Sequence, residues 1–180
     1  PTLRNELIIR LLYQTGLRRG ELTEIRLSDI DTDLREINVH AEKTHLNRVV
    51  FYKPSLNTLM SRWINVDRKS LVTASSEYLY PTYKTEKISP EQINRTVRKA
   101  AENAGLQEEV YANAEGNVQV KITAHVLRHS FAMNCLKTGM DSKFIQELMG
   151  HAKIETTERY LQTMYDDVRD AYRKRGPPTA

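Results

Sequence analysis

The stretch "TGLRRGEL", residues 15–22, interrupts one helical pattern and begins another. Leucine and isoleucine recur at helical spacing through residues 3–12, and the apolar pattern resumes at Leu22. This arrangement predicts a helix, a tight turn at the glycine and a second short helix. The turn brings Arg18 to the start of the second helix, where its planar guanidinium could hold two oxygens of a phosphate. Taken alone, an arginine in such a place is more often a surface residue.

The rest of the chain predicts one β-hairpin and several helices. Apolar and polar residues alternate on both sides of a polar gap within residues 35–54, which is typical of a hairpin that ends at Pro54. Helical patterns cover residues 55–64, residues 91–104, and nearly everything from residue 123 onward, with breaks near Gly139 and Gly150. Residues 72–88 look irregular, with one short strand at residues 78–80. The predicted fold class is α+β, mostly α-helical with a small antiparallel β-sheet, in a single domain of residues 1–180.

Composition narrows the class of protein. The chain has 180 residues, of which 39% are hydrophobic, enough for a core of ordinary size. Its net charge of +4 permits an anionic partner without requiring one. Cys135 is the only cysteine, so no intrachain disulfide can form, and we interpret this thiol as a packing residue in a reducing compartment. No apolar run approaches the roughly 20 residues of a membrane span, so we expect a soluble, cytoplasmic protein.

A set of polar residues resists explanation by packing. In "HVLRHSFA", residues 125–132, a histidine and an arginine stand three apart and share one face of a helix. In "GHAKIETTERY", residues 150–160, a histidine and a tyrosine flank a pair of threonines, and little in the stretch suits a core. His129 could pair with His125 as metal ligands, but the zinc-protease glutamate and a third ligand at a recognisable spacing are missing. The full set is Arg18, Lys43, His125, Arg128, His151 and Tyr160.

Taken together, these stretches resemble the catalytic domain of the tyrosine recombinases, the phage-integrase and Xer-like family that cuts and rejoins DNA through a tyrosine. "TGLRRGEL" looks like the first-arginine motif and "EKTHLNR", residues 42–48, like the hairpin lysine. "HVLRHSFA" looks like the His-x-x-Arg box, and "MGHAKIETTERY", residues 149–160, like the closing histidine and tyrosine. The four motifs occur in family order across nearly the whole chain, whereas residues 72–120 match only loosely. Lys53 is an alternative to Lys43.

The resemblance implies a role for each residue of the set. Tyr160 would attack the DNA phosphate and His151 would donate a hydrogen bond near it. Arg18 and Arg128 would hold the nonbridging oxygens, where negative charge develops. His125 would accept the phenol proton, and Lys43 would protonate the departing 5′-oxygen. Because a 3′-phosphotyrosine link would keep the bond energy of the cut strand, we expect no metal, ATP or other cofactor.

The resemblance also implies partners. The expected substrate is double-stranded DNA at specific recombination sites, associated with a nucleoid or a viral genome. Family members usually carry an N-terminal DNA-clamping domain, and nothing before Pro1 resembles one, so we expect this chain to be the catalytic half. Residues 166–180 can form a short amphipathic helix, which in the family often packs on a neighbouring protomer. We therefore expect a monomer without DNA and a homotetramer on paired sites.

Two alternatives remain open at this point. Residues 134–160 also fit the helix-turn-helix of a noncatalytic DNA-binding protein, in which Tyr160 would read DNA or pack. That interpretation gives no reason for Arg18 and Lys43, which lie far away in the sequence. A type IB topoisomerase or telomere resolvase would share the tyrosine chemistry, and the small size and the pattern of residues 150–160 favour a recombinase.

Overall fold

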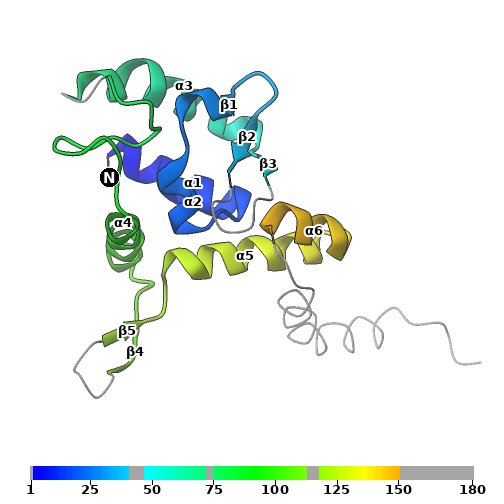
Figure 1. The fold of residues 1–180 in the computed structure, drawn as a ribbon. Helices are drawn as coiled ribbons and strands as arrows, with labels where there is room; N and C mark the ends of the chain where they lie inside the picture. The colour runs from blue at the N-terminus through cyan, green and yellow to red at the C-terminus, as the bar shows by residue number, and fades with distance from the viewer. Residues whose placement is uncertain (1, 41–46, 72–74, 113–117, 151–180) are drawn as a thin grey trace, which may run out of the picture.

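The structure is a computed structural model that describes residues 2–40, 47–71, 75–112 and 118–150, shown as coloured ribbon in Figure 1. Three of the six predicted site residues lie outside these ranges, namely Lys43, His151 and Tyr160. The predicted tail helix of residues 166–180 lies outside them as well.

The turn at residues 15–22 joins two helices, as predicted. Helix α1 (Leu3–Thr15) ends where Gly16 adopts φ 65°, and the Gly16 N–H donates to the Leu12 carbonyl over 3.1 Å. A left-handed residue at this place ends a helix at little cost only when it has no Cβ. A Cβ on Gly16 would also collide with the ring of Phe131 from a later helix. Helix α2 (Arg19–Glu24) then begins with Arg18 as its N-cap.

The predicted hairpin forms the centre of a small antiparallel sheet. Strand β2 (Glu36–Val39) pairs with β3 (Arg48–Phe51), and Ile37 lies opposite Val50. Both of these side chains are buried, as the alternating pattern predicts. A third strand, β1 (Ile30–Asp31), pairs with the outer side of β2 and was not predicted, since two residues are too few to show an alternation.

The segment after the hairpin departs from the prediction in two ways. The helical run starts in a 3-10 turn (Pro54–Leu56) and continues through α3 (Asn57–Arg62), a π turn (Trp63–Asp67) and a second 3-10 turn (Arg68–Ser70). It extends past the predicted end at residue 64, and in this extension the buried Arg68 donates from Nε to the Tyr78 carbonyl over 3.0 Å. The predicted strand at residues 78–80 is wrong, because only an isolated bridge between Tyr78 and Arg26 forms there.

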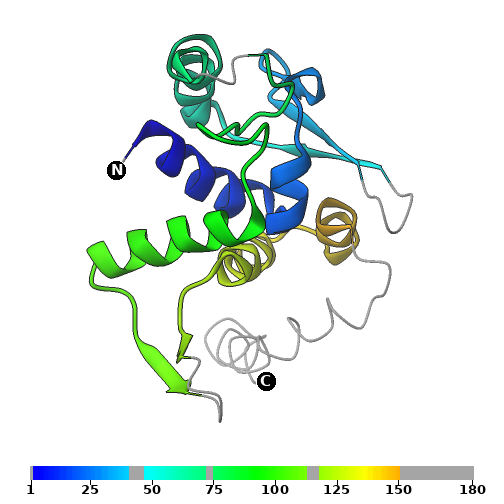
Figure 2. The same ribbon diagram turned by 60° about the vertical axis from the view of Figure 1, so that its left-hand side comes forward.

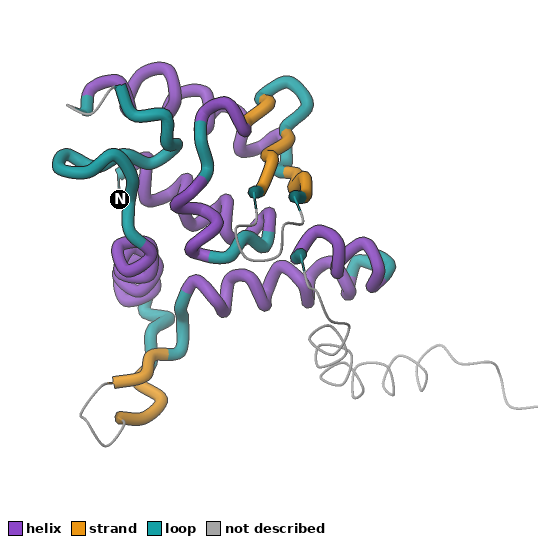
Figure 3. The backbone as a smooth tube through the Cα atoms, in the orientation of Figure 1, coloured by secondary structure: helices purple, strands orange, loops and turns teal. Residues whose placement is uncertain are grey.

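The C-terminal half of the described chain is mainly helical. Helix α4 (Pro90–Asn103) follows Ser89, whose hydroxyl accepts from the Gln92 N–H while the Gln92 side chain accepts from the Ser89 N–H. Strands β4 (Glu109–Ala112) and β5 (Val118–Val120) form a second, unpredicted hairpin, drawn apart from the main sheet in Figure 3. Helices α5 (Ala124–Lys137) and α6 (Ser142–Met149) follow, with breaks at Gly139 and Gly150 as predicted.

The elements assemble around α1. Helices α4 and α5 both pack on α1, and α6 lies beside strand β3 at one end of α5 (Figures 1 and 2). The main apolar cluster fills the space between α1, the three-stranded sheet and α3. The predicted fold class, mostly helical with a small antiparallel sheet, is therefore confirmed, with a second hairpin added. None of the helices in the described ranges has the length and apolar character needed to cross a membrane.

A candidate active site around three arginines

The candidate site begins at the N-terminus of α2, where Glu21 faces back toward Arg18. The Arg18 N–H donates to Glu21 Oε2 over 2.7 Å, and Arg18 Nη1 donates to Glu21 Oε1 over 2.8 Å. A glutamate at the third position of a helix satisfies a backbone N–H that has no partner within the helix. The same carboxylate therefore caps α2 and orients the Arg18 guanidinium.

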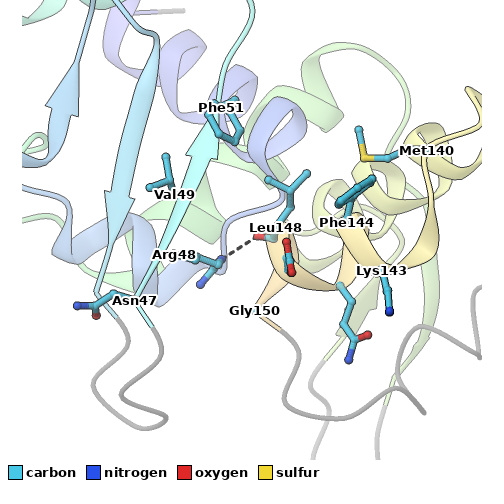
Figure 4. Close-up of a pocket in the computed structure, with 11 residues that line it drawn as sticks. Asn47, Arg48, Val49, Phe51, Met140, Lys143, Phe144, Leu148 and Gly150 are labelled. Carbon is cyan, nitrogen blue, oxygen red and sulfur yellow. Dashed lines mark hydrogen bonds between the residues drawn. The ribbon is translucent and has the colours of Figure 1, made fainter.

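Strand β3 brings a second arginine to the same carboxylate. Arg48 Nη1 donates to Glu21 Oε1 over 2.9 Å and Arg48 Nη2 donates to Glu21 Oε2 over 2.8 Å, which is a bidentate pair. The third nitrogen, Arg48 Nε, donates to the Leu148 carbonyl at the end of α6 over 2.7 Å, the bond drawn in Figure 4. Arg48 thus joins the sheet, α2 and α6 through one side chain.

Helix α5 supplies a third arginine, which is buried. Arg128 donates from Nη1 to the Gly16 carbonyl and from Nη2 to the Met149 carbonyl, the latter over 2.6 Å. Its Nη1 also lies 3.9 Å from Glu21 Oε2. We refer to Arg18, Arg48, Arg128 and Glu21 as the arginine cluster.

The arginine cluster closes on the C-terminus of α6. Arg18 Nη2 donates to the Gly150 carbonyl over 3.1 Å, so Leu148, Met149 and Gly150 each accept a hydrogen bond from a different arginine. The last carbonyls of a helix lack partners within it and carry the negative end of the helix dipole. Three guanidiniums at this end therefore stabilise the last turn of α6.

The electrostatics of the cluster leave it positively charged. Burial by itself would raise the pKa of Glu21, but hydrogen bonds from Arg48, the charge of Arg48 and the hydrogen bonds from Arg18 together lower that pKa below its usual value of 4.5. Glu21 is thus ionised at neutral pH and balances only one of three guanidiniums. The Arg18 side chain is 46% exposed, so part of this excess charge faces solvent, where an anion can approach.

The structure brings together two of the predicted residues and places a third nearby in the chain. Arg18 and Arg128 meet at Glu21 and at the end of α6. His125 lies in the first turn of α5, one turn before Arg128, and is exposed. Arg128 was expected to hold a phosphate, yet its two terminal nitrogens already bind backbone carbonyls and it is only 4% exposed.

Described residues at the arginine cluster stand near Lys43 and His151 in the sequence. Residues 41–46, which contain Lys43, connect the ends of β2 and β3 at the paired residues Val39 and Arg48. Gly150, which accepts from Arg18, directly precedes His151. Lys53, the alternative lysine, follows the opposite end of β3, where its N–H donates to Gln14 Oε1 over 3.0 Å. Of the two lysines, only Lys53 lies within the described residues, and it is at the end of β3 that is farther from Arg48.

Sequence reasoning missed Glu21 and Arg48, although both carried a signal. Glu21 stands three residues after the N-cap Arg18, the position at which a glutamate caps a helix. Arg48 stands two residues before the buried Val50, so the alternation of β3 places a charged residue on the inward face. A charge on an inward face needs a buried partner.

The described residues hold no group of three His, Cys, Asp or Glu side chains that could bind a metal ion. His125 and His129 share α5, but a pair of histidines without a third protein ligand falls short of a usual zinc site. Cys135 packs against the small apolar cluster between α5 and α6, as predicted.

Comparison with known proteins identifies the family to which the chain belongs. Residues 2–166 match the phage integrase family. The chain is 32% identical to tyrosine recombinase XerC 2 of Ralstonia nicotianae over 93% of its own length and 45% of that protein, and 32% identical to tyrosine recombinase XerA of Pyrococcus furiosus over 94% and 54%. The chain thus spans about half the length of these relatives.

Solved structures agree in fold. The crystal structure of XerA recombinase superimposes with a TM-score of 0.81 at 30% identity, over 98% of this chain and 60% of that one. XerH site-specific recombinase bound to palindromic difH substrate superimposes with a TM-score of 0.77 at 23% identity, over 94% of this chain and 45% of that one. The chain belongs to the phage integrase family and has the catalytic-domain fold of the tyrosine recombinases.

Proposed function

We propose that this chain is the catalytic domain of a site-specific DNA recombinase that cuts and rejoins DNA strands through a 3′-phosphotyrosine intermediate at Tyr160. The observation that carries the proposal is the convergence of Arg18 and Arg128 on the end of α6, directly before the segment that contains His151 and Tyr160. A noncatalytic helix-turn-helix protein would need no such convergence.

The proposed chemistry uses the positive charge of the arginine cluster. When the Tyr160 hydroxyl attacks phosphorus, negative charge grows on the two nonbridging oxygens, and donors already aimed at them lower the barrier. Arg18, which is partly exposed, is the better placed of the two clamping arginines. Arg128 is buried and donates to the Gly16 and Met149 carbonyls, and the proposal keeps it as the second clamp because it stands in the stretch that resembles the family's His-x-x-Arg box.

Proton transfer completes the proposed reaction. The phenol loses its proton to His125 as the O–P bond forms, and the P–O5′ bond breaks as Lys43 protonates the leaving oxygen. His151 donates a hydrogen bond to the phosphate. Religation reverses these transfers with a new 5′-hydroxyl, so the bond count is unchanged and the step needs neither ATP nor a metal.

An exposed basic face supports DNA as the partner. Helix α4 buries Ile93 and Val97, and on its other side exposes Arg95, Arg98 and Lys99. Together with Arg19 of α2, these residues line one depression, in which the four basic side chains outnumber two glutamates, Glu91 and Glu102. Asn94 of α4 accepts from the Ala124 N–H at the start of α5, so this basic face is linked to the turn that carries His125.

Assembly on DNA is part of the proposal. We infer a monomer without DNA and a homotetramer on two paired sites, in which residues 166–180 pack on the next protomer. A contact of this head-to-tail kind closes into a ring only when the angle between protomers is right. The proposed location is therefore inside the cell, in association with chromosomal or viral DNA.

The test is covalent attachment to nicked DNA, read on a denaturing gel. The chain should form an adduct, and Tyr160→Phe should form none while binding DNA nearly as tightly, because only one hydroxyl is lost. Tyr165→Phe is the matched control and should attach normally. Sequencing the attached DNA would then identify the recombination site and the polarity of the link.

Two results would redirect the assignment. An adduct formed by Tyr160→Phe and lost in Tyr165→Phe would move the nucleophile to Tyr165. DNA binding by the wild-type chain without any adduct would favour the noncatalytic DNA-binding alternative.

A further inference from the structure

Arg48 is the member of the arginine cluster that the proposed reaction does not use. It is the first residue of β3, and its side chain is only 9% exposed. Its three guanidinium nitrogens all donate to other parts of the protein: two to Glu21 and one to the Leu148 carbonyl. A guanidinium engaged on all three nitrogens is poorly placed to bind a substrate.

The partners of Arg48 are the immediate neighbours of the proposed reacting groups. Glu21 also accepts from the backbone and the side chain of Arg18, so the position of Arg18 depends on the position of Glu21. Leu148 lies three residues before His151. Arg48 itself follows residues 41–46, which contain Lys43, with one residue between.

The backbone of α6 is shaped to accept Arg48. Gly150 adopts φ 60° as the C-cap of α6, and a Cβ there would lie 2.8 Å from Arg48 Nη1 and 3.0 Å from Arg48 Cζ. The Arg48 side chain therefore lies close to a residue that has no side chain of its own; Arg48 and Gly150 are both labelled in Figure 4. A side chain at position 150 would strain the left-handed turn, and the Arg48 guanidinium would have to shift to make room for its Cβ.

We propose that Arg48 is a positioning residue of the recombination reaction, which acts through Glu21 on Arg18. This inference rests on the proposed function. Arginine suits this role because three nitrogens fixed in one plane each donate to a different acceptor, whereas a lysine would have to make all three bonds from one nitrogen on a flexible stem. Arg48 would therefore determine the position of Arg18 without contributing to the affinity for DNA.

The test is a double-mutant cycle between Arg48→Lys and Arg18→Ala. The full chain is used at saturating nicked DNA of the sequence recovered from the adduct, and the single-turnover rate constant for cleavage is measured. Misplacing a reacting group by about 1 Å can cost up to about 100-fold, so Arg48→Lys should slow cleavage by at least roughly 10-fold with little change in DNA affinity. Arg62→Lys, in an exposed ion pair with Asp67, is the matched control and should react like the wild type.

The cycle separates positioning from a merely structural role. If Arg48 acts through Arg18, adding Arg48→Lys to Arg18→Ala should cost no more than about 2-fold, because the interaction it supports is already gone. If Arg48 had only a structural role, Arg48→Lys would lower the fraction of protein that reacts or leave the cleavage rate constant unchanged. Alternatively, the fold-reductions in rate caused by Arg48→Lys and Arg18→Ala would multiply in the double variant. Any of those three results overturns the inference.

Two further outcomes are decisive. If Arg48→Lys does not fold, Glu21→Gln takes its place in the same cycle, since it keeps Arg48 but removes the charge that holds it; a fully additive result again overturns the inference. If the wild-type chain forms no adduct with any nicked DNA, the proposed function is wrong and the inference falls with it. Adduct formation at wild-type rate by Arg48→Lys contradicts the inference alone.

Discussion

The core around α1 and the junction between α5 and α6 are held together by different forces. Around α1, a large cluster of buried aliphatic and aromatic side chains joins three helices to the sheet. At the junction, the apolar cluster is small, and Phe144 of α6 is 62% exposed. The buried residues of that small cluster are Phe131, Ala132, Ile145 and Met149.

The difference shows how the candidate site is built. Apolar burial is nearly independent of direction, so it stabilises the core without setting the angle of any one side chain closely. Helix α6 instead depends on three arginines that donate to its last carbonyls, and hydrogen bonds of this kind are directional. The junction buries little apolar surface and is held by directional hydrogen bonds instead. These bonds fix the positions of the arginine side chains, which the proposed reaction requires.

The largest expected effect falls on the junction. Arg18→Ala and Arg128→Ala should each slow cleavage by about 100-fold or more, because each removes a donor from the developing charge. Only Arg128→Ala should also lower the thermal unfolding midpoint, since it leaves the buried Gly16 and Met149 carbonyls without that donor. Single-turnover cleavage and thermal unfolding of both variants would measure this; a near-normal rate in either would remove that arginine from the site.

A change in the core should have the opposite signature. Leu11 is fully buried in the large cluster, and Leu11→Ala should lower the free energy of unfolding by roughly 2–5 kcal/mol. The cleavage rate constant of the folded variant should stay at the wild-type value, because α6 and its arginines remain in place. Denaturant unfolding and cleavage at low temperature would test this. A 10-fold loss of rate would mean that core and junction are coupled.

Acid should weaken the junction before the core. The pKa of Glu21 is lowered in the folded protein, so its contribution to stability is complete above the usual value of 4.5 and is lost as pH falls through the lower folded value. At neutral pH, Glu21→Gln should cost on the order of 1–3 kcal/mol, the range for a buried polar group that loses its charged partner. Below pH 4.5 the wild type should lose stability more steeply than this variant. The free energy of unfolding of the wild type and of Glu21→Gln would be measured against pH. Parallel profiles would show that Glu21 does not stabilise the junction.

The smallest effect concerns neither region but the exposed face of α4. Affinity for DNA should fall steeply with salt, and replacing Arg95 and Arg98 by glutamine should reduce the slope of log affinity against log salt by about one for each phosphate that the variant no longer neutralises. Arg10→Gln together with Arg62→Gln, which removes the same charge from exposed positions outside α4, is the control. An equal change of slope in both pairs would mean that α4 is not a specific DNA-binding element, and a flat salt dependence of the wild type would argue against DNA as the partner.

Local signals in the sequence were enough for most of the elements. Gly16 ended α1, Ser89 began α4, and the alternation on both sides of residues 41–46 marked β2 and β3. The signal failed where an element was very short, as in the two-residue β1, or where pairing came from neighbours distant in the chain, as with Tyr78 and Arg26. A pattern needs several residues to repeat before it can predict a structure.

The sequence by itself also supplied the prediction that Arg18, His125 and Arg128 belong to one site, because the stretches that contain them resemble the motifs of one family. Only the tertiary structure decided how Arg18 and Arg128 are held. The bonds from Arg48 join residues 27 and 100 positions apart in the chain, to Glu21 and Leu148 respectively. Local propensity carries no information about such distant pairs. They form because a guanidinium on the inward face of a strand needs hydrogen-bond acceptors, and the packing of α2 and α6 places Glu21 and the Leu148 carbonyl beside it.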